Sequence, residues 1–386
     1  MEPELQRRED ETRPAQHSVP EPDHKFGDTL RQTREPDWIE RIFVGPQGLR
    51  AGWSILLFYG MYYVFRVVLG TIFFSTGLVG ETMDDSAGAI LIEDLIPFLA
   101  LLPSAGLMAL LEGRRISSYN LSGPKRARRL AMGAGAGFVV LSLLVAVLTA
   151  GGWLRFDHTI LPARQAMRFG IIWGCAFLVV GSVEEGLFRC YGLFTLARGI
   201  NFWWALAAEA VICVDAFVAT GRNGAWGVYL AAALGLFPCL ILHRKRAASS
   251  AFWQAAWVTS SVFGLYHTQN TGENWIGVFA AAGIGFVFCL SVRLTGSAMW
   301  AIGFHAAWDW TETFFYGTAD SGLQGQGHLL TSNPAGSPIW SGGADGPEGS
   351  LLVLGVILLL SLLLLVLYRR GWRAAPSATR TANDQQ

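Results

Sequence analysis

The chain has 386 residues, of which 52% are hydrophobic and 15% are charged, and its formal net charge is zero. Soluble domains carry about 25% charged residues, so this composition, with a mean hydropathy of +0.37, indicates a polytopic membrane protein rather than a soluble one. The balanced charge provides no basic surface for nucleic acid, and no nucleic-acid partner is expected.

The N-terminal segment, residues 1–50, is polar and rich in charge and proline, and it contains no apolar stretch that would mark a cleaved signal peptide. We expect it to form a disordered cytoplasmic tail. The transmembrane domain is predicted to occupy residues 51–370, and residues 371–386 are predicted to form a second cytoplasmic tail.

Ten apolar runs follow, each approaching or reaching the 17–25 residues that cross a bilayer. They lie near residues 53–75, 89–111, 130–152, 170–195, 203–220, 224–242, 251–268, 275–292, 297–316 and 350–368. The fifth to seventh runs are short, aromatic-rich or interrupted by glycine. The sequence therefore predicts an all-α, polytopic transmembrane helical bundle of about 8–10 spans.

The loops between these runs predict the orientation, because Lys and Arg concentrate on the cytoplasmic side. Basic residues gather at 114–129, 243–246 and 369–373, whereas loop 81–85 is acidic and loop 317–349 contains no Lys or Arg. Ten crossings with both termini in the cytoplasm satisfy these loops. We expect a multi-pass protein of the cell membrane, with residues 317–349 as an extracytoplasmic connector.

The fourth run contains two adjacent acids, Glu184 and Glu185, followed by Arg189. A charged side chain near the bilayer centre costs on the order of 3 kcal/mol, so such a cluster indicates a functional site. Glu185 and Arg189 are four residues apart on one helix face and are expected to pair. Glu184 points about 100° away and remains available as a base.

Two histidines lie in later apolar runs at the same spacing from a possible partner. Phe263 and His267 are one helical turn apart, and so are His305 and Asp309. An aspartate one turn from a histidine can fix its tautomer and raise its basicity. We therefore regard both histidines as candidate site residues.

Three motifs thus occur in separate predicted helices, in a fixed order. They read Glu184-Glu-Gly-Leu-Phe-Arg-Cys-Tyr-Gly-Leu-Phe194, Ser260-Ser-Val-Phe-Gly-Leu-Tyr-His267 and Thr295-Gly-Ser-Ala-Met-Trp-Ala-Ile-Gly-Phe-His-Ala-Ala-Trp-Asp309. Over residues 120–316, this pattern resembles the CPBP family, which comprises type II CAAX prenyl endopeptidases and bacteriocin-processing proteins and is also called the Abi family.

The resemblance implies an all-helical, glutamate-type intramembrane endopeptidase with six site residues: Glu184, His267, His305, Asp309, Glu185 and Arg189. The first two would activate a water molecule, the next two would stabilise the tetrahedral oxyanion, and the last two would orient the site. The implied substrate is a membrane-associated, lipidated or secreted peptide or protein, reached in or at the lipid bilayer.

Two features depart from the family pattern. The third motif often ends in asparagine, but this chain has Asp309, and an ionised aspartate cannot donate a hydrogen bond to an oxyanion. Residues 199–250 also separate the first two motifs and contain two additional apolar runs. We interpret this segment as an inserted helical hairpin, which would preserve the membrane topology.

No cofactor is expected. A zinc site remains an alternative, with Glu184, His267 and His305 as ligands, because zinc commonly takes His and Asp/Glu ligands.

Two other functions also remain open. The scaffold could serve a noncatalytic membrane protein for binding or immunity, or the buried Glu and His residues could belong to an ion- or proton-coupled carrier.

Overall fold

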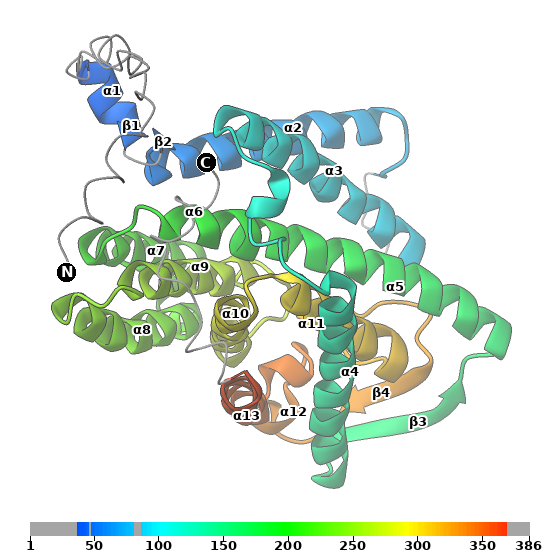
Figure 1. The fold of residues 1–386 in the computed structure, drawn as a ribbon. Helices are drawn as coiled ribbons and strands as arrows, with labels where there is room; N and C mark the ends of the chain where they lie inside the picture. Colours follow the sequence, from blue (N-terminus) through cyan, green and yellow to red (C-terminus); the bar gives the residue numbers. More distant parts are fainter. Residues whose placement is uncertain (1–36, 46–47, 81–85, 369–386) are drawn as a thin grey trace, which may run out of the picture. The chain divides into compact units, whose positions relative to one another are not determined.

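The computed structural model describes residues 37–45, 48–80 and 86–368 (Figure 1). Three predicted features lie wholly or mostly outside these residues, namely the tail at 1–50, the acidic loop at 81–85 and the tail at 371–386.

Contacts divide the chain into two units, residues 1–44 and 45–386. The structure describes one helix of the first unit, α1 (Trp38–Phe43), which is followed by the short strands β1 (Val44–Gly45) and β2 (Gly48–Leu49). The remaining elements all belong to the second unit.

The described chain is dominated by helices, as predicted for an all-α bundle. The long helices are α2 (Ala51–Ser75), α3 (Ala87–Leu111), α4 (Arg126–Ala150), α5 (Ala163–Glu185), α7 (Phe202–Gly224), α8 (Trp226–Arg244), α9 (Ser250–His267), α10 (Trp275–Thr295), α11 (Met299–Asp309) and α13 (Leu352–Leu367). The shorter elements are η2 (Ile116–Ser118), β3 (Leu154–Ile160), η3 (Gly186–Gly192), α6 (Leu193–Ala197), η4 (Trp310–Tyr316), β4 (Leu330–Pro334), α12 (Pro338–Ser341) and η5 (Pro347–Gly349).

All ten predicted apolar runs form helices, but they differ in length and composition. Among the described residues, seven helices are long and apolar enough to cross a membrane: α2, α3, α4, the continuous helix of α5, η3 and α6, α7, α8 and α10. Helix α13 is shorter, with 16 residues. Helices α9 and α11 do not meet this standard, because one is rich in Ser and Thr and the other has 11 residues.

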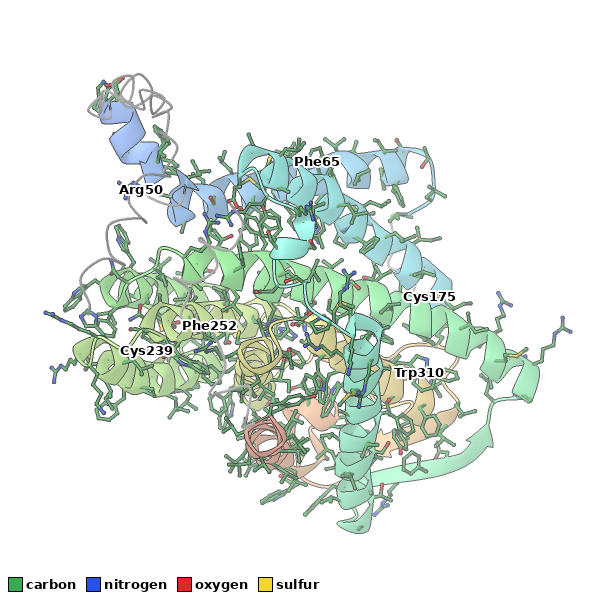
Figure 2. The ribbon with its side chains drawn as sticks, viewed as in Figure 1. Arg50, Phe65, Cys175, Cys239, Phe252 and Trp310 are labelled. Carbon is green, nitrogen blue, oxygen red and sulfur yellow. The ribbon has the colours of Figure 1, made fainter. Side chains whose placement is uncertain are left out.

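Large apolar side chains project outward from several helices of the second unit (Figure 2). They are concentrated on α2, α7, α8 and α13, and include Val64, Val218, Phe237 and Leu359. An exposed apolar surface of this extent would favour aggregation in water, whereas lipid tails solvate it. The protein is therefore a multi-pass membrane protein.

Helices α4 and α11 approach so closely that only glycine fits between them. A Cβ atom at Gly133 or Gly137 of α4 would collide with the backbone of Trp300 or Phe304, and one at Gly303 of α11 would collide with Leu130. Small residues spaced by four allow such backbone contact between membrane helices. This contact fixes the position of α11, which carries the third motif.

The first and third motifs each adjoin a π-helical segment. The π-helix η3 begins immediately after α5, which ends at Glu185, and the π-helix η4 begins immediately after α11, which ends at Asp309. One extra residue per turn rotates the side chains that follow, and π-helical turns often occur at functional sites.

Loop 317–349 has more structure than the simple connector that its composition predicts. Its strand β4 pairs antiparallel with β3, with Arg155 opposite Asn333, and α12 and η5 follow. Gly342 and Gly346 adopt positive φ angles of 81° and 101° where backbone segments of the loop meet, a conformation that glycine accommodates without strain.

Candidate active site

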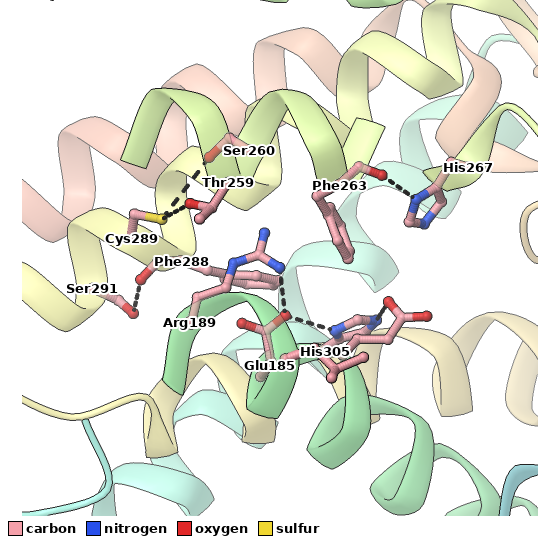
Figure 3. Close-up of polar contacts among 12 residues, drawn as sticks. Glu185, Arg189, Thr259, Ser260, Phe263, His267, Phe288, Cys289, Ser291 and His305 are labelled. Carbon is pink, nitrogen blue, oxygen red and sulfur yellow. Dashed lines mark hydrogen bonds and ion pairs between the residues drawn. The ribbon is translucent and has the colours of Figure 1, made fainter. Parts of the chain in front are cut away.

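Glu185 and Arg189 form an ion pair inside the protein, as their spacing predicts (Figure 3). Their closest atoms, Oε1 and Nη1, are 3.2 Å apart, and neither side chain is exposed. The Arg189 guanidinium also lies over the rings of Phe263 and Phe288, at 4.1 and 5.3 Å from their centroids. These cation–π contacts compensate for guanidinium N–H groups that have no hydrogen-bond acceptor.

His305 lies among three carboxylates, all of which belong to predicted site residues. Its Nδ1 is 3.1 Å from Oε1 of Glu185, and that oxygen also accepts from Arg189 (Figure 3). Its Nε2 is 3.6 Å from Oε2 of Glu184 and 3.5 Å from Oδ2 of Asp309. The first and third motifs therefore meet at this imidazole, between α5 and α11.

The close approach of α5 and α11 is also set by a glycine. A Cβ atom at Gly181 would lie 3.2 Å from the backbone nitrogen of Ala306 and 3.3 Å from the carbonyl oxygen of Ile302. These distances are tighter than ordinary contacts. Gly181 thus lets the two helices bring Glu184 and His305 within reach of each other.

His267 is held by its own helix. Its Nδ1 is 2.8 Å from the carbonyl oxygen of Phe263, which can only accept, so Nδ1 carries a proton. In the neutral ring, Nε2 then has a free lone pair. Within the described part of the chain, no hydrogen bond or ion pair joins His267 to the other predicted site residues.

One cavity nevertheless connects His267 with Glu184, His305 and Asp309. It offers about 210 Å³ to the centres of water-sized molecules, whereas one water needs only about 10–15 Å³ on that measure. Its other polar lining side chains are Asp94, Asn270, Asp320, Ser321 and Glu348. The predicted site residues therefore share a polar space with room for several waters.

Asp94, Asp320 and Glu348 were missed by the sequence analysis. Asp94 lies in the apolar helix α3 and could have been found by the signal that singled out Glu184, an ionisable residue within an apolar run. Asp320 and Glu348 lie in loop 317–349, where no periodic pattern relates them to the helices. Only the folded loop brings them to the cavity.

A second cavity adjoins the first, and Glu184 and Asp94 line both. It lies between α2, α3, α5 and η3, and its other lining residues are mostly apolar: Tyr62, Arg66, Gly70, Val79, Gly80, Glu93, Ile96, Pro97, Val180, Val183, Leu187, Phe188 and Tyr266. It therefore provides an approach to Glu184 that is lined by apolar side chains together with Arg66, Glu93 and Asp94.

The residues that the structure places close enough to bind one metal ion are not the three predicted zinc ligands. Within the described residues, Asp309, Asp320 and Glu348 place one ligand oxygen each within 4.8 Å of the others. Glu184, His267 and His305 do not form such a group among those residues.

Three loop carboxyls at the cavity have strongly raised pKa values. Burial and the nearby carboxylates of Asp345 and Glu348 raise the pKa of Glu273 to about 9. Burial and Glu348 raise the pKa of Asp345 to about 8. Burial, together with Asp309 and Glu348, likewise raises the pKa of Asp320 well above its ordinary value. This end of the cavity therefore accumulates negative charge as the pH rises.

Comparison with known families gives one match. Residues 235–311 match the family model described as type II CAAX prenyl endopeptidase Rce1-like. This Rce1-like region supports a protein of the CPBP type. No curated protein and no solved structure gives a match.

The Rce1-like match begins within α8 and ends just after α11. It contains His267, His305 and Asp309, whereas Glu184, Glu185 and Arg189 lie outside it. The match supports a membrane-embedded protease, without specifying its catalytic mechanism. The catalytic roles of the six predicted residues stay predictions.

Proposed function

We propose that this chain is a glutamate-type intramembrane endopeptidase whose water is held between Glu184 and His267. The observation that carries the proposal is the meeting of the first and third motifs at His305, in a cavity that His267 also lines. Oε2 of Glu184 is buried and has no hydrogen-bond partner, so it is free to accept a proton from water.

In the proposed reaction, Glu184 takes one proton from the water, while the other hydrogen of the water stays bound and donates a hydrogen bond to Nε2 of His267. The water oxygen attacks the peptide carbonyl and forms a tetrahedral oxyanion. His305, doubly protonated among its three carboxylates, donates a hydrogen bond to that oxyanion. Collapse of the intermediate breaks the C–N bond, and Glu184 returns its proton to the leaving amine.

Asp309 has a different role in this proposal from that of the family's asparagine. As a carboxylate 3.5 Å from Nε2 of His305, it can form an ion pair with the protonated ring but cannot donate to the oxyanion. It would therefore orient the imidazole and balance its charge. Glu185 and Arg189 would hold His305 from the other side through the shared Oε1 oxygen.

For the substrate, we propose a membrane-associated peptide, and a peptide with a prenylated cysteine is the first class to test, because the matched family is described by that activity. The apolar second cavity supports this choice, since it provides space for a lipid group beside Glu184. We further propose a cell-membrane location with both termini in the cytoplasm, from the distribution of Lys and Arg between the loops.

The decisive experiment compares wild-type protein with Glu184→Gln in lipid nanodiscs. The substrates are a quenched fluorescent peptide with a farnesylated cysteine and the same peptide without the lipid. Loss of the general base should lower kcat by about 10²–10⁴-fold, with unchanged expression and thermal stability. Equal cleavage rates would show that Glu184 is not the base.

Three further outcomes separate the alternatives. Cleavage by neither protein, of any lipidated or unlipidated peptide, would favour a noncatalytic binding protein. Uptake of a solute or ion that fails in Glu184→Gln, without peptide cleavage, would favour a carrier. Wild-type activity that is lost with a chelator and restored by zinc, but not by Ca²⁺, would support the zinc alternative.

A further inference from the structure

Five carboxylates gather where loop 317–349 meets the end of α11 and η4. We call Asp309, Glu312, Asp320, Asp345 and Glu348 the acidic cluster. The loop itself contains no Lys or Arg. Within the described part of the chain, His305 is the basic side chain that contacts this cluster, through Asp309.

Neutral donors hold two members of the cluster in place. The indole N–H of Trp308 donates to Oε1 of Glu348 at 2.6 Å, and the hydroxyl of Ser321 donates to its Oε2 at 2.8 Å. The hydroxyl of Thr313 donates to Oδ2 of Asp320 at 3.0 Å. These bonds orient the carboxylates but add no positive charge.

Three of the carboxylates have the spacing of a cation site. Asp309, Asp320 and Glu348 each offer an oxygen within 4.8 Å of the other two. Oxygens that bind one Ca²⁺ at 2.3–2.6 Å lie at most about 5 Å apart. All three side chains also line the main cavity, so water can reach the same point.

Glu312 points independently to a ligand at the cluster. Its side chain is 0% exposed, and neither carboxylate oxygen has a hydrogen-bond partner. The charged groups that act on it are Glu348, Asp320, Asp309 and Asp345. It is thus a fully buried, unpartnered acid that faces the other carboxylates.

Two buried acids elsewhere in the described part of the chain are paired with arginine. Glu112 pairs with Arg114 at 3.5 Å and with Arg198 at 3.1 Å, and Glu185 pairs with Arg189. A buried carboxylate without such a partner is costly. The acidic cluster must therefore take up either protons or a cation.

We propose that a divalent cation binds at Asp309, Asp320 and Glu348, and that Ca²⁺ is the best match. Carboxylate oxygens are the ligands of hard cations, and Ca²⁺ accepts six to eight oxygens in irregular geometry, including waters. Mg²⁺ requires near-ideal octahedral geometry, which an irregular loop and two helical segments provide less readily. The ion would fasten loop 317–349 to the helix that carries His305.

The cation site shares Asp309 with the proposed hydrolytic site, but the proposed water-activating residues, Glu184 and His267, are not among its ligands. Cation binding should therefore survive in Glu184→Gln, whether or not that variant or the wild type cleaves a peptide. Failure of the cation site and failure of the proposed function can thus be told apart.

The test uses the full chain in detergent or nanodiscs after removal of divalent ions with a chelator. Tb³⁺ replaces Ca²⁺ as a luminescent probe, because the Trp308 indole that contacts Glu348 can sensitise its emission. We expect saturable Tb³⁺ emission that Ca²⁺ displaces, and a higher Tm in CaCl₂. Asp320→Asn and Glu348→Gln should each weaken Ca²⁺ binding at least about tenfold.

The matched control is Asp157→Asn, which removes an exposed carboxylate of β3 outside the cluster and should bind Ca²⁺ like the wild type. The proposal would be overturned if the wild type binds no ⁴⁵Ca²⁺ up to about 10 mM, tenfold above the weakest usual extracellular affinities. It would also be overturned if folded Asp320→Asn and Glu348→Gln bind Ca²⁺ with unchanged affinity. The wild-type measurement decides the question even if those variants fail to fold.

Discussion

His305 of α11 contacts α5 through its two ring nitrogens. Its Nδ1 meets the Glu185 oxygen that also binds Arg189, and its Nε2 faces Glu184 and Asp309. Three carboxylates and one arginine surround this imidazole, so a proton on both ring nitrogens brings the charges closer to balance. Each neighbour therefore affects both stability and the availability of a proton donor.

At the residue scale, Arg189→Ala should lower the free energy of unfolding. It leaves the Glu185 carboxylate buried beside Glu184, and loss of one partner of a buried ion pair typically costs about 3–5 kcal/mol. Thermal unfolding in detergent and membrane yield would measure the loss. Arg168→Ala, on the same helix but exposed, is the control and should unfold like the wild type.

A second residue-scale prediction concerns Asp309. In Asp309→Asn, the amide oxygen can still accept from His305, and its NH₂ group can donate to an oxyanion. We expect kcat/KM within about tenfold of the wild type for Asp309→Asn, but a loss of about 10²–10³-fold for Asp309→Ala. Peptide cleavage at saturating Ca²⁺ would measure both. Equal losses in the two variants would argue against an orienting role for this side chain.

The local contacts of the site could be predicted from sequence, whereas its nonlocal contacts could not. The Glu185–Arg189 pair follows from a spacing of four on one helix. The bond from His305 to Glu185 joins residues 120 positions apart, and it depends on the close packing of α5 and α11. Asp320 and Glu348 depend on the path of an irregular loop, which no periodic pattern encodes.

At the element scale, the contact between α4 and α11 sets the position of the third motif. The glycine spacing in α4 is visible in the sequence, but the helix that it faces is not. The π-helical segments η3 and η4 were also not predicted, because they depend on which backbone hydrogen bonds the packed helices retain. Both segments directly follow site residues.

Gly137→Ala tests this contact directly. The new Cβ would collide with the backbone of Phe304, and overpacking of this kind usually costs about 1–3 kcal/mol. We expect a lower Tm and reduced peptide cleavage, because α11 carries His305 one residue further on. Gly135→Ala is the control on the same helix, since a Cβ there meets no atom within 4 Å. It should be neutral or slightly stabilising, as alanine favours the helix.

At the scale of the whole molecule, the candidate site draws on α3, α5, α9, α11 and loop 317–349. The Rce1-like match covers residues 235–311 and so contains two of the three motifs. Helix α7 and the first part of α8 lie between the first motif and this match, and both helices pack against α9. The predicted insertion at 199–250 therefore contacts the helix that carries His267.

The loop carboxyls give the whole protein a pH-dependent stability. Folding raises the pKa of Glu273 from 4.5 to about 9, so the folded state holds a proton that the unfolded state releases. The stabilisation that this proton gives the folded state is complete below about pH 4.5. It is lost as the pH rises toward 9, and the free energy of unfolding then falls by at most about 1.4 kcal/mol per pH unit. Asp345, with a pKa of about 8, acts in the same direction.

In the presence of a chelator, the Tm of the wild type should therefore fall between pH 5 and pH 9. Glu273→Gln keeps a neutral side chain beside Asp345 and Glu348 at every pH, so its Tm should fall less and exceed that of the wild type at pH 8. Asp157→Asn, outside the loop cluster, should follow the wild type. A parallel decline in Glu273→Gln and the wild type would mean that Glu273 is already ionised in the fold. Added Ca²⁺ should reduce the decline in the wild type, because a bound cation replaces protons in neutralising the nearby acids.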